Sequence, residues 1–290
     1  MAESRVHVVT GGGSGIGRAV AEMLPKDDIV VITGRHKEKL DKVAGELNQA
    51  GHHIETAVCD VSKREDVAAL AELAASFGHI ATVVHAAGIS GSMGDPEMIV
   101  RINALGTVYV NQEFHKRMQG GCIVDVASNS GYMLPNILIP EKRYPLALED
   151  EDAFVKALAR RAHLVPGDGA SSQIAYMISK NFARWYSAKC AFKYMRLKNI
   201  RVFSVSPGFV ETPMTKKEKG KATDILLGYA GPARGARPEE LAYLICTLAD
   251  ERCSYLMGTD VLCDAGCIEG GYRLTAATDE KKVPVPGSAW

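Results

Sequence analysis

The chain has 290 residues, of which 47% are hydrophobic and 23% are charged, a composition typical of a globular protein with a large core. Lysine plus arginine number 34, as do aspartate plus glutamate, so no net charge favours nucleic acid or an anionic membrane as a partner. The sequence shows no signal peptide and no apolar run near the roughly 20 residues of a membrane span, and we expect a cytoplasmic protein.

The cysteine pattern indicates free thiols. The 7 cysteines include no C-x-x-C pair, and most lie in apolar runs, which predicts reduced and mostly buried side chains. Cys263 and Cys267 are close in sequence, but no further His/Cys pair completes a zinc site. No metal is therefore expected.

The N-terminal stretch has the pattern of a nucleotide-binding turn. A β-branched run at Arg5–Thr10 is followed by T-G-G-G-S-G-I-G and a helical pattern starting near Ile16. Glycines let the backbone approach a phosphate closely, and a helix start offers free N–H groups to an anion. The spacing of Gly11, Gly15 and Gly17 differs from G-x-G-x-x-G, and the turn could be only a tight connection. Strand, turn and helix together favour nucleotide binding.

The second predicted strand, Ile29–Thr33, ends beside Arg35. Folds that bind NAD tend to place a carboxylate near this point, where it accepts from the ribose 2′-hydroxyl. Arg35 stands there instead, with Lys37 and Lys39 after it. A guanidinium suits a 2′-phosphate, so the sequence favours NADP(H), with NAD(H) as the other possibility. The alternative is a solvated basic start of the next helix.

The following elements continue the alternation of helices and strands. A helix at His36–Ala50 precedes a strand at Ile54–Cys59, after which comes Asp60. The Asp60 carboxylate could accept from an adenine amino group or cap the helix predicted at Lys63–Phe77. A fourth strand, Ala81–His85, runs into the small residues A-A-G, as needed where a backbone passes beneath a flat cofactor.

Two polar residues stand out in the middle of the chain. The long helix predicted at Asp95–Met118 contains Asn103 between apolar residues, where its amide must be either bonded structurally or used by a site. The fifth strand, Cys122–Ala127, ends at Ser128, whose hydroxyl would point into the crevice where ligands bind. Ser130 is its nearest competitor.

A long connection separates the fifth strand from the next helix. Residues 132–172 hold an apolar stretch, M-L-P-N-I-L-I-P, and a helix predicted at Glu149–His163, so the segment should be functional or carry its own structure. The helix predicted at Ser172–Lys198 then places Tyr176 and Lys180 on one face. The lysine's positive charge would lower the pKa of the tyrosine, which could then give or take a proton near neutral pH.

The last part of the chain completes the pattern with a strand at Ile200–Ser206, a charged loop at Lys216–Lys221, a helix at Pro238–Ala249 and a strand at Gly258–Cys263. The alternation predicts an α/β fold of the Rossmann type, with a doubly wound, mostly seven-stranded parallel sheet flanked by helices. We expect one domain over residues 1–267, with a helical insertion at about 132–172 near the substrate mouth, and a tail at 268–290.

Together these motifs resemble the short-chain dehydrogenase/reductase family over about residues 4–266. The matching pieces are T-G-G-G-S-G-I-G, C-D-V, H-A-A-G, I-N at 102–103, V-A-S at 126–128, Y-x-x-x-K and P-G-F-V-E-T. His85 departs from the asparagine usual in the family, and C-D-A-G at 263–266 departs from the frequent D-G-G. The long stretch between Ser128 and Tyr176 resembles the bacterial 3α-hydroxysteroid dehydrogenase/carbonyl reductase subgroup.

The resemblance implies a role for each matching residue. Tyr176 would donate the proton in reduction, and Ser128 would polarise and orient the substrate oxygen. Lys180 would bind the nicotinamide ribose and lower the pKa of Tyr176, and Asn103 would hold a water of a proton relay. The expected cofactor-binding residues are Gly11, Ser14, Gly15, Ile16, Gly17, Arg35, Asp60, Val61, Ala86, Ala87, Gly88, Tyr176, Lys180, Pro207, Gly208, Val210 and Thr212.

Apolar side chains are expected to form the wall of the substrate pocket. The candidates are Met133, Leu134, Ile137 and Leu138 from the insertion, and Phe209, Met214, Leu226, Leu227 and Tyr229 after the sixth strand. They favour a bulky apolar ketone or secondary alcohol, steroid-like or aromatic. The alternative is that they only pack the insertion onto the body.

The implied activity is that of an NADP(H)-dependent carbonyl reductase or hydroxysteroid dehydrogenase, which interconverts a ketone and a secondary alcohol. One alternative is an NAD-dependent hydroxysteroid or alcohol dehydrogenase. Others are an enoyl reductase or sugar epimerase of the same fold, and a non-catalytic NADP-binding regulator. We expect a small-molecule substrate and a homo-oligomer, a dimer or tetramer, although the insertion could obstruct the helix-pair interface common in the family.

Overall fold

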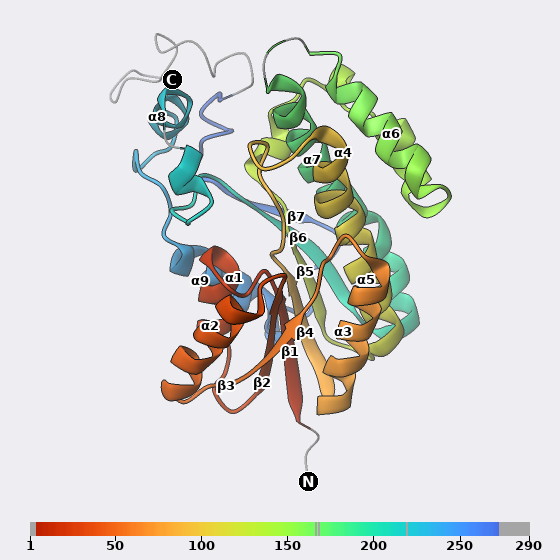
Figure 1. Cartoon of the computed structure of the whole chain (residues 1–290), viewed down its shortest axis with the longest axis vertical. Helices are drawn as coiled ribbons and strands as arrows, with labels where there is room; N and C mark the ends of the chain where they lie inside the picture. Colours follow the sequence, from red (N-terminus) through yellow and green to blue (C-terminus); the bar gives the residue numbers. More distant parts are fainter. Residues whose placement is uncertain (1–3, 166, 168, 219, 273–290) are drawn as a thin grey trace.

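A parallel sheet between two layers of helices forms the body of the protein (Figure 1). The computed structural model describes residues 4–272 except 166, 168 and 219. The seven strands lie in the order β3-β2-β1-β4-β5-β6-β7, and the predicted doubly wound α/β fold is confirmed. The strands are β1 (Arg5–Thr10), β2 (Ile29–Gly34), β3 (His53–Val58), β4 (His79–His85), β5 (Cys122–Val126), β6 (Arg201–Pro207) and β7 (Asp260–Cys263).

Helices cover both faces of the sheet because its strands are apolar on both sides. On one face lie α1 (Gly15–Met23), α2 (Lys37–Gln49) and α9 (Pro238–Ala249), and on the other lie α3 (Arg64–Phe77), α5 (Gly106–Arg117) and α7 (Ala170–Lys198). Neighbouring strand residues therefore enter different clusters, as Val8 and Val9 do. The strand order reverses between β1 and β4, and the carboxyl ends of these strands form a crevice there.

The helix predicted at Asp95–Met118 is interrupted by a wider turn. It forms as α4 (Pro96–Ile99), a π-helical segment at Val100–Leu105, and α5. Asp95 begins it by accepting a hydrogen bond from Met98 N at 2.8 Å. The predicted long helix is therefore present over Pro96–Arg117, and its π-helical stretch was not foreseen. Asn103 lies in the π-helical segment, a kind of turn that is frequent at functional sites.

The predicted insertion carries its own helical structure. The 3₁₀ helix Asn129–Tyr132 leads into it. The insertion itself contains 3₁₀ helices at Asn136–Leu138 and Glu141–Leu148, followed by α6 (Glu151–Ala162). In Figure 1, α6 lies on the outer side of α7. The ring centroids of Phe154 and Phe182 are 4.8 Å apart, so the insertion is held to α7 by buried aromatic contacts.

The segment after β6 is more helical than expected. Within the predicted charged loop, residues Thr215–Glu218 form a 3₁₀ helix. Helix α8 (Lys221–Gly228), which was not predicted, begins at the last residue of that loop. Ile268 and Tyr272, from the start of the predicted tail, are buried in a small cluster with Ile225. Residues 273–290 of the predicted tail lie outside the described part of the chain.

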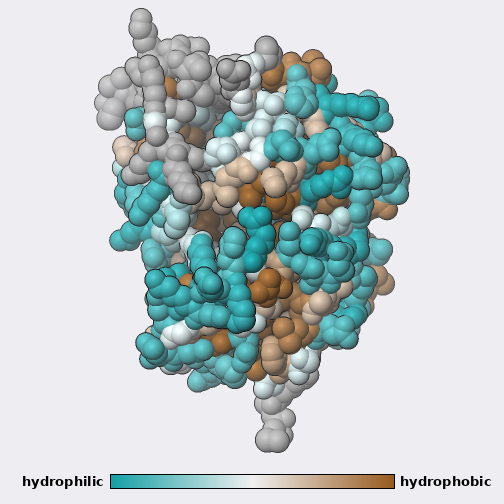
Figure 2. All heavy atoms as spheres, viewed as in Figure 1, coloured by the Kyte–Doolittle hydropathy of each residue, from teal (hydrophilic) through white to brown (hydrophobic). Residues whose placement is uncertain are grey.

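Hydrophobic side chains gather in the middle of the face drawn in Figure 2, with hydrophilic side chains around them. Figure 1, drawn from the same side, places the upper ends of the central strands in this region. Within the described residues, we find no helix that is both long and apolar enough to cross a membrane.

Candidate active site

The glycine-rich turn between β1 and α1 is closed tightly on itself. Gly11 and Gly15 have φ angles of 72° and 55°, a region that favours glycine. A methyl group added at Gly17 would lie 2.5 Å from the carbonyl oxygen of Gly11. The turn thus brings backbone against backbone at the start of α1, where free N–H groups attract an anion. These residues fit the phosphates of a dinucleotide.

We expect Gly17→Ala to weaken binding of the reduced nicotinamide cofactor by about tenfold or more, because the backbone of the turn must move to admit the methyl group. Gly45→Ala is the matched control. It lies on α2, where an added methyl group would have no neighbour within 4 Å, so the affinity for the cofactor should not change. Titration followed by nicotinamide fluorescence measures the affinity of each variant for the cofactor. Equal affinities in the two variants would contradict a role of this turn in cofactor binding.

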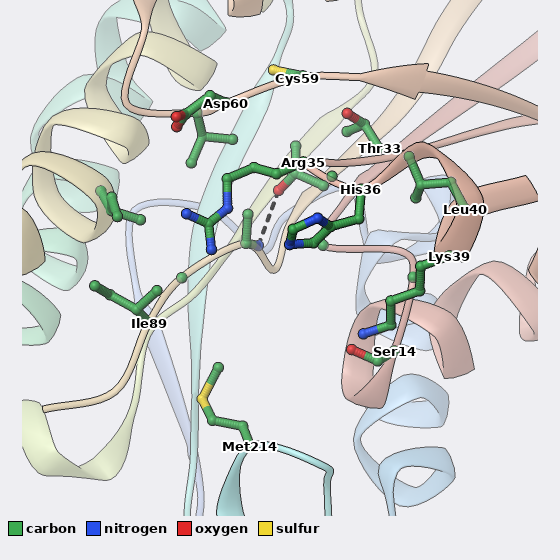
Figure 3. Close-up of a pocket in the computed structure, with 18 of the residues that line it drawn as sticks. Ser14, Thr33, Arg35, His36, Lys39, Leu40, Cys59, Asp60, Ile89 and Met214 are labelled. Carbon is green, nitrogen blue, oxygen red and sulfur yellow. Dashed lines mark hydrogen bonds between the residues drawn. The ribbon is translucent and has the colours of Figure 1, made fainter. Parts of the chain in front are cut away.

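A cavity of about 350 Å³ opens beside the turn, at the ends of β1, β2 and β3. Its lining includes the predicted residues Gly11, Ser14, Arg35, Asp60, Val61, Ala87 and Gly88. Arg35 and His36, which follow the end of β2, and Lys39, from the first turn of α2, extend into it (Figure 3). Arg35 forms no hydrogen bond or ion pair with a described residue, whereas Lys37 is bound to Asp41, with Nζ 2.6 Å from the carboxylate.

Asp60 lines this cavity and also closes a local turn. Its Oδ1 accepts hydrogen bonds from the amide and hydroxyl of Ser62, at 3.0 and 2.7 Å. Helix α3 begins at Arg64, and Lys63 is its N-terminal cap residue. The interpretation of Asp60 as a helix cap was therefore wrong, because the carboxylate bends the chain before the helix starts.

A second cavity, of about 220 Å³, continues the first along the sheet. The two share Gly11, Ser14, Ala87, Gly88 and Met214 in their linings. The predicted residues that line the second cavity are Gly11, Ser14, Gly15, Ile16, Gly17, Ala86, Ala87, Gly88, Ser128, Tyr176, Lys180, Pro207, Gly208, Val210 and Thr212. Every predicted site residue except Asn103 thus lines one of the two cavities.

Lys180 is the most deeply buried cation of the site. Its Nζ donates to the carbonyl oxygen of Val126 at 2.8 Å and lies 6.0 Å from the ring centroid of Tyr176. Burial lowers the pKa of Lys180 to about 8, an effect that the charge of Asp125 opposes. The ammonium can therefore exert its charge on the half-buried Tyr176 at neutral pH.

Asp125 lies on β5, next to the residue whose carbonyl holds Lys180. Its carboxylate accepts hydrogen bonds from Asn111 Nδ2 at 2.9 and 3.0 Å and from Ser187 Oγ at 2.6 Å. Burial raises the pKa of Asp125 to about 6, while these hydrogen bonds and Lys180 act in the opposite direction. The carboxylate is therefore mostly charged at pH 7, beneath the cavity.

Asn103 is satisfied structurally. Its Oδ1 accepts from Ile89 N at 2.9 Å, and its Nδ2 donates to Ile89 O at 2.9 Å and to Ser179 Oγ at 3.2 Å. A methyl group added at Gly88 would lie 3.1 Å from Asn103 Oδ1 and 3.6 Å from Lys180 Nζ. The amide thus lies close to the lysine, and its predicted part in a proton relay stays a prediction.

Of the two candidate serines, Ser128 faces the cavity. It follows the end of β5 in an extended conformation, and its Oγ accepts from Ser130 N at 3.2 Å. The hydroxyl of Ser130 is buried and has no hydrogen-bond partner among the described residues. The structure therefore favours Ser128 over Ser130 as the serine of the candidate site.

His85 replaces the family's usual asparagine with another buried contact. Its Nδ1 lies 2.8 Å from Thr10 Oγ1, which also accepts a hydrogen bond from Ala87 N at 3.1 Å. Burial, with the positive charge of Lys180, lowers the pKa of His85 to about 3, so its ring is neutral. A neutral imidazole thus links the end of β1 to the chain leaving β4.

The apolar residues expected around the substrate are divided among different places. Met214 lines both cavities, whereas Met133 and Tyr229 are buried in a cluster apart from the main cores. Leu134 packs in the core beneath α7, and Ile137 is 79% exposed, so neither forms the expected wall. The alternative interpretation, that these side chains only pack the insertion onto the rest of the protein, therefore holds for part of this set.

The sequence reasoning missed His36, Ile89 and Met93 among the lining residues of the first cavity. His36 directly follows Arg35, and Ile89 directly follows the A-A-G stretch, so position next to a motif could have found both. Met93 lies farther along the loop after β4 and has no such signal.

Comparison with known proteins agrees with this arrangement. The family model described as short chain dehydrogenase matches residues 5–139, and the one described as Enoyl-(Acyl carrier protein) reductase matches residues 164–267. The unmatched stretch between them lies within the insertion and contains α6.

Similar proteins span nearly the whole chain. The 3-oxoacyl-[acyl-carrier-protein] reductase FabG of Thermotoga maritima is 27% identical, over 92% of this chain and 98% of its own. The cis-4-hydroxycyclohexanecarboxylate dehydrogenase of Sinomonas cyclohexanicum is also 27% identical, over 90% and 96%.

Solved structures share the fold at low sequence identity. A short-chain type dehydrogenase/reductase from Mycobacterium ulcerans has a TM-score of 0.74 at 22% identity, with 91% of this chain and 90% of that chain covered. A variant of the actinorhodin polyketide ketoreductase with NADPH has a TM-score of 0.71 at 23% identity, with 93% and 98% covered. The two family models, with relatives that match over nine tenths of the chain, carry the assignment: the chain belongs to the short-chain dehydrogenase/reductase family.

Proposed function

We propose that the protein is an NADP(H)-dependent oxidoreductase that interconverts a ketone and a secondary alcohol on a bulky apolar substrate. The observation that carries this proposal is the meeting of Ser128, Tyr176 and Lys180 around one cavity, which continues into the cavity beside the glycine-rich turn. A bound nicotinamide cofactor would supply or accept the hydride. The residues of the chain would supply orientation and the proton.

Each of the three side chains has a chemical task in this proposal. The Tyr176 hydroxyl gives its proton to the carbonyl oxygen in reduction and takes it back in oxidation. The Ser128 hydroxyl donates a hydrogen bond to the same oxygen and orients it. Lys180 holds a positive charge beside the Tyr176 ring, which favours the phenolate and makes proton transfer easier.

The preference for NADP(H) is supported by the charges around the first cavity. Arg35 and Lys39 extend into it, and Arg35 has no partner among the described residues (Figure 3). A guanidinium can bind a phosphate with two hydrogen bonds at once. The ketoreductase with a similar fold is a complex with NADPH, which fits this preference.

We expect Arg35→Ala to raise the Kd for NADPH by about ten- to a hundredfold and to leave the Kd for NADH nearly unchanged. Lys37→Ala is the control, because the Lys37 ammonium is already bound to Asp41 and should not contribute to cofactor binding. Titration of each variant with NADPH and with NADH, followed by nicotinamide fluorescence, measures the Kd for each cofactor. Tighter binding of NADH than NADPH by the unaltered protein would overturn the proposed cofactor.

An apolar substrate is supported by the residues where the two cavities meet. Ile89 and Met214 line both of them. We propose a steroid-like or aromatic carbonyl compound. Turnover of a panel of steroid, aromatic and sugar ketones with NADPH tests this, and activity on small polar sugars alone would contradict it.

We also propose a cytoplasmic homo-oligomer whose subunit contacts avoid the part of α7 covered by the insertion. All seven cysteines are free, which suits a reducing compartment. Phe154 and Leu158 of α6 are fully buried and belong to the same core cluster as Phe182 of α7, so a partner subunit could not reach that surface. Light scattering of the purified protein measures the assembly.

A further inference from the structure

The position of the Ser128 hydroxyl depends on the turn that follows it. Strand β5 ends at Val126, and the chain then forms the 3₁₀ helix Asn129–Tyr132, which Ser128 caps by accepting from Ser130 N. Ser128 is thus fixed on one side by the sheet and on the other by this turn. Whatever holds the turn also holds the serine in its place at the cavity.

The far end of the turn is bound to a buried carboxylate on the edge strand. The hydroxyl of Tyr132 donates to Asp260 Oδ2 at 2.5 Å, and Ser204 and Ser206 donate to Oδ1 at 2.5 and 3.0 Å. The side chain of Asp260 is 8% exposed. In the register of β6 and β7, Ser204 and Asp260 are paired, so their side chains share one face of the sheet. Three hydroxyl groups therefore converge on one carboxylate.

Arg184 joins this carboxylate to the helix that carries Tyr176 and Lys180. Its Nε lies 3.2 Å from Asp260 Oδ2, as an ion pair, and its guanidinium carbon lies 3.3 Å from the ring centroid of Tyr132. The same side chain donates to the carbonyl oxygen of Gly131 at 3.3 Å. Arg184 is 22% exposed, so its charge is balanced mainly by Asp260.

The turn also lies directly against the backbone of α7. A methyl group added at Gly131 would be 2.9 Å from the amide nitrogen of Asn181. Asn181 Nδ2 donates to Gly131 O at 2.8 Å, and Tyr144, from the insertion, donates to Asn181 Oδ1 at 2.8 Å. The turn after Ser128 is therefore bound on two sides, to β7 through Tyr132 and to α7 through Gly131.

We propose that Asp260 is a positioning residue for carbonyl reduction, which keeps Ser128 opposite Tyr176 by binding Tyr132 and Arg184. No contact of Asp260 with the two cavities is needed for this. Loss of its charge leaves Arg184 and the Tyr132 hydroxyl without their partner, and the turn can then shift relative to α7. A displacement of about 1 Å at a reacting group can lower a rate by roughly a hundredfold.

The test uses Asp260→Asn and Tyr132→Phe, measured for kcat, KM and NADPH Kd. We expect Asp260→Asn to lower kcat for a ketone by about ten- to a hundredfold, with a Kd for NADPH within about threefold of the unaltered protein. Tyr132→Phe keeps the ring beneath Arg184 and removes only the hydroxyl, so its kcat should fall by about three- to tenfold. Asp250→Asn, a half-exposed aspartate that is paired with Arg252 on the adjoining 3₁₀ turn, is the control and should not change kcat.

The inference rests on the proposed carbonyl reduction, and the outcomes keep the two apart. An unaltered protein that binds NADPH but reduces no ketone in the panel would contradict the proposed function itself. An active protein whose kcat is unchanged in Asp260→Asn would overturn the positioning role alone. A merely structural role predicts a lower melting temperature with an unchanged kcat per NADPH-binding molecule. Should Asp260→Asn fail to fold, an unchanged kcat in Tyr132→Phe would overturn the proposal instead.

Discussion

Replacing Tyr176 with phenylalanine should lower kcat/KM for ketone reduction by about a thousandfold or more, while the Kd for NADPH changes by less than about threefold. The substitution removes one hydroxyl and leaves the ring in place beside Lys180. It therefore removes the proposed proton donor and keeps the shape of the cavity. Single-turnover measurement at saturating NADPH reports the loss directly, because cofactor binding is then complete.

Two controls show whether the loss belongs to this hydroxyl. Tyr243→Phe removes the hydroxyl of a tyrosine that is 68% exposed on α9 and should leave kcat/KM unchanged. A Tyr176→Phe variant with a normal rate would mean that another group, such as the Ser128 hydroxyl, supplies the proton. A variant that no longer binds NADPH would instead place Tyr176 in cofactor binding rather than proton transfer.

Local patterns were enough to predict the sheet, most of its helices and most of the residues around the cavities. Gly17 lies in the first turn of α1, where an added methyl group would meet the backbone of Gly11, and Tyr176 and Lys180 are neighbours on one helix face. Both features depend on residues a few positions apart, so their geometry follows from helix and turn dimensions. This is why the strand ends and Ser128 could be predicted without the structure.

Features that depend on distant parts of the chain could not be predicted in the same way. Tyr132, Arg184 and Asp260 meet only because β7 pairs with β6 in one register and α7 packs beside the turn. The π-helical segment forms where the Asn103 amide bonds to Ile89, a contact with another loop. Neither contact produces a repeating pattern of polar residues in the sequence, so sequence periodicity could not reveal it.

Hydrophobicity alone also failed to separate pocket, core and surface within the insertion. Leu134 and Ile137 belong to one apolar stretch, yet the first is buried in the core and the second is exposed to solvent. Single exposed apolar residues are common on protein surfaces. The direction of each side chain is set by the 3₁₀ turns of this segment, which have no strong sequence signature.

Lys180→Met should give a protein that is inactive but more stable at neutral pH. The variant loses the charge beside Tyr176, and we expect kcat/KM to fall by about a thousandfold. Its free energy of unfolding at pH 7 should exceed that of the unaltered protein by about 1–3 kcal/mol, because a buried ammonium is replaced by an apolar side chain of similar length. Urea unfolding without cofactor measures this difference.

The pH dependence of that difference identifies its origin. The folded protein releases the Lys180 proton near pH 8, whereas the unfolded chain holds it up to about pH 10.4. Between these values the unfolded chain binds more protons, so the stability of the unaltered protein rises with pH, and the cost of burial is complete only below pH 8. The methionine variant lacks this rise, so its advantage should shrink toward zero by about pH 10.

Asp125 keeps the expected gain in stability moderate but does not reverse its sign. Without Lys180 its carboxyl loses a nearby positive charge, so its pKa rises further above 6 and more of it is protonated at pH 7. The buried carboxylate then avoids part of the cost of an unpaired charge.

Lys193→Met is the control for Lys180→Met. It removes an exposed lysine from the same helix and should change neither activity nor the pH dependence of stability. A Lys180→Met variant less stable than the unaltered protein at every pH would mean that the buried ammonium stabilises the fold.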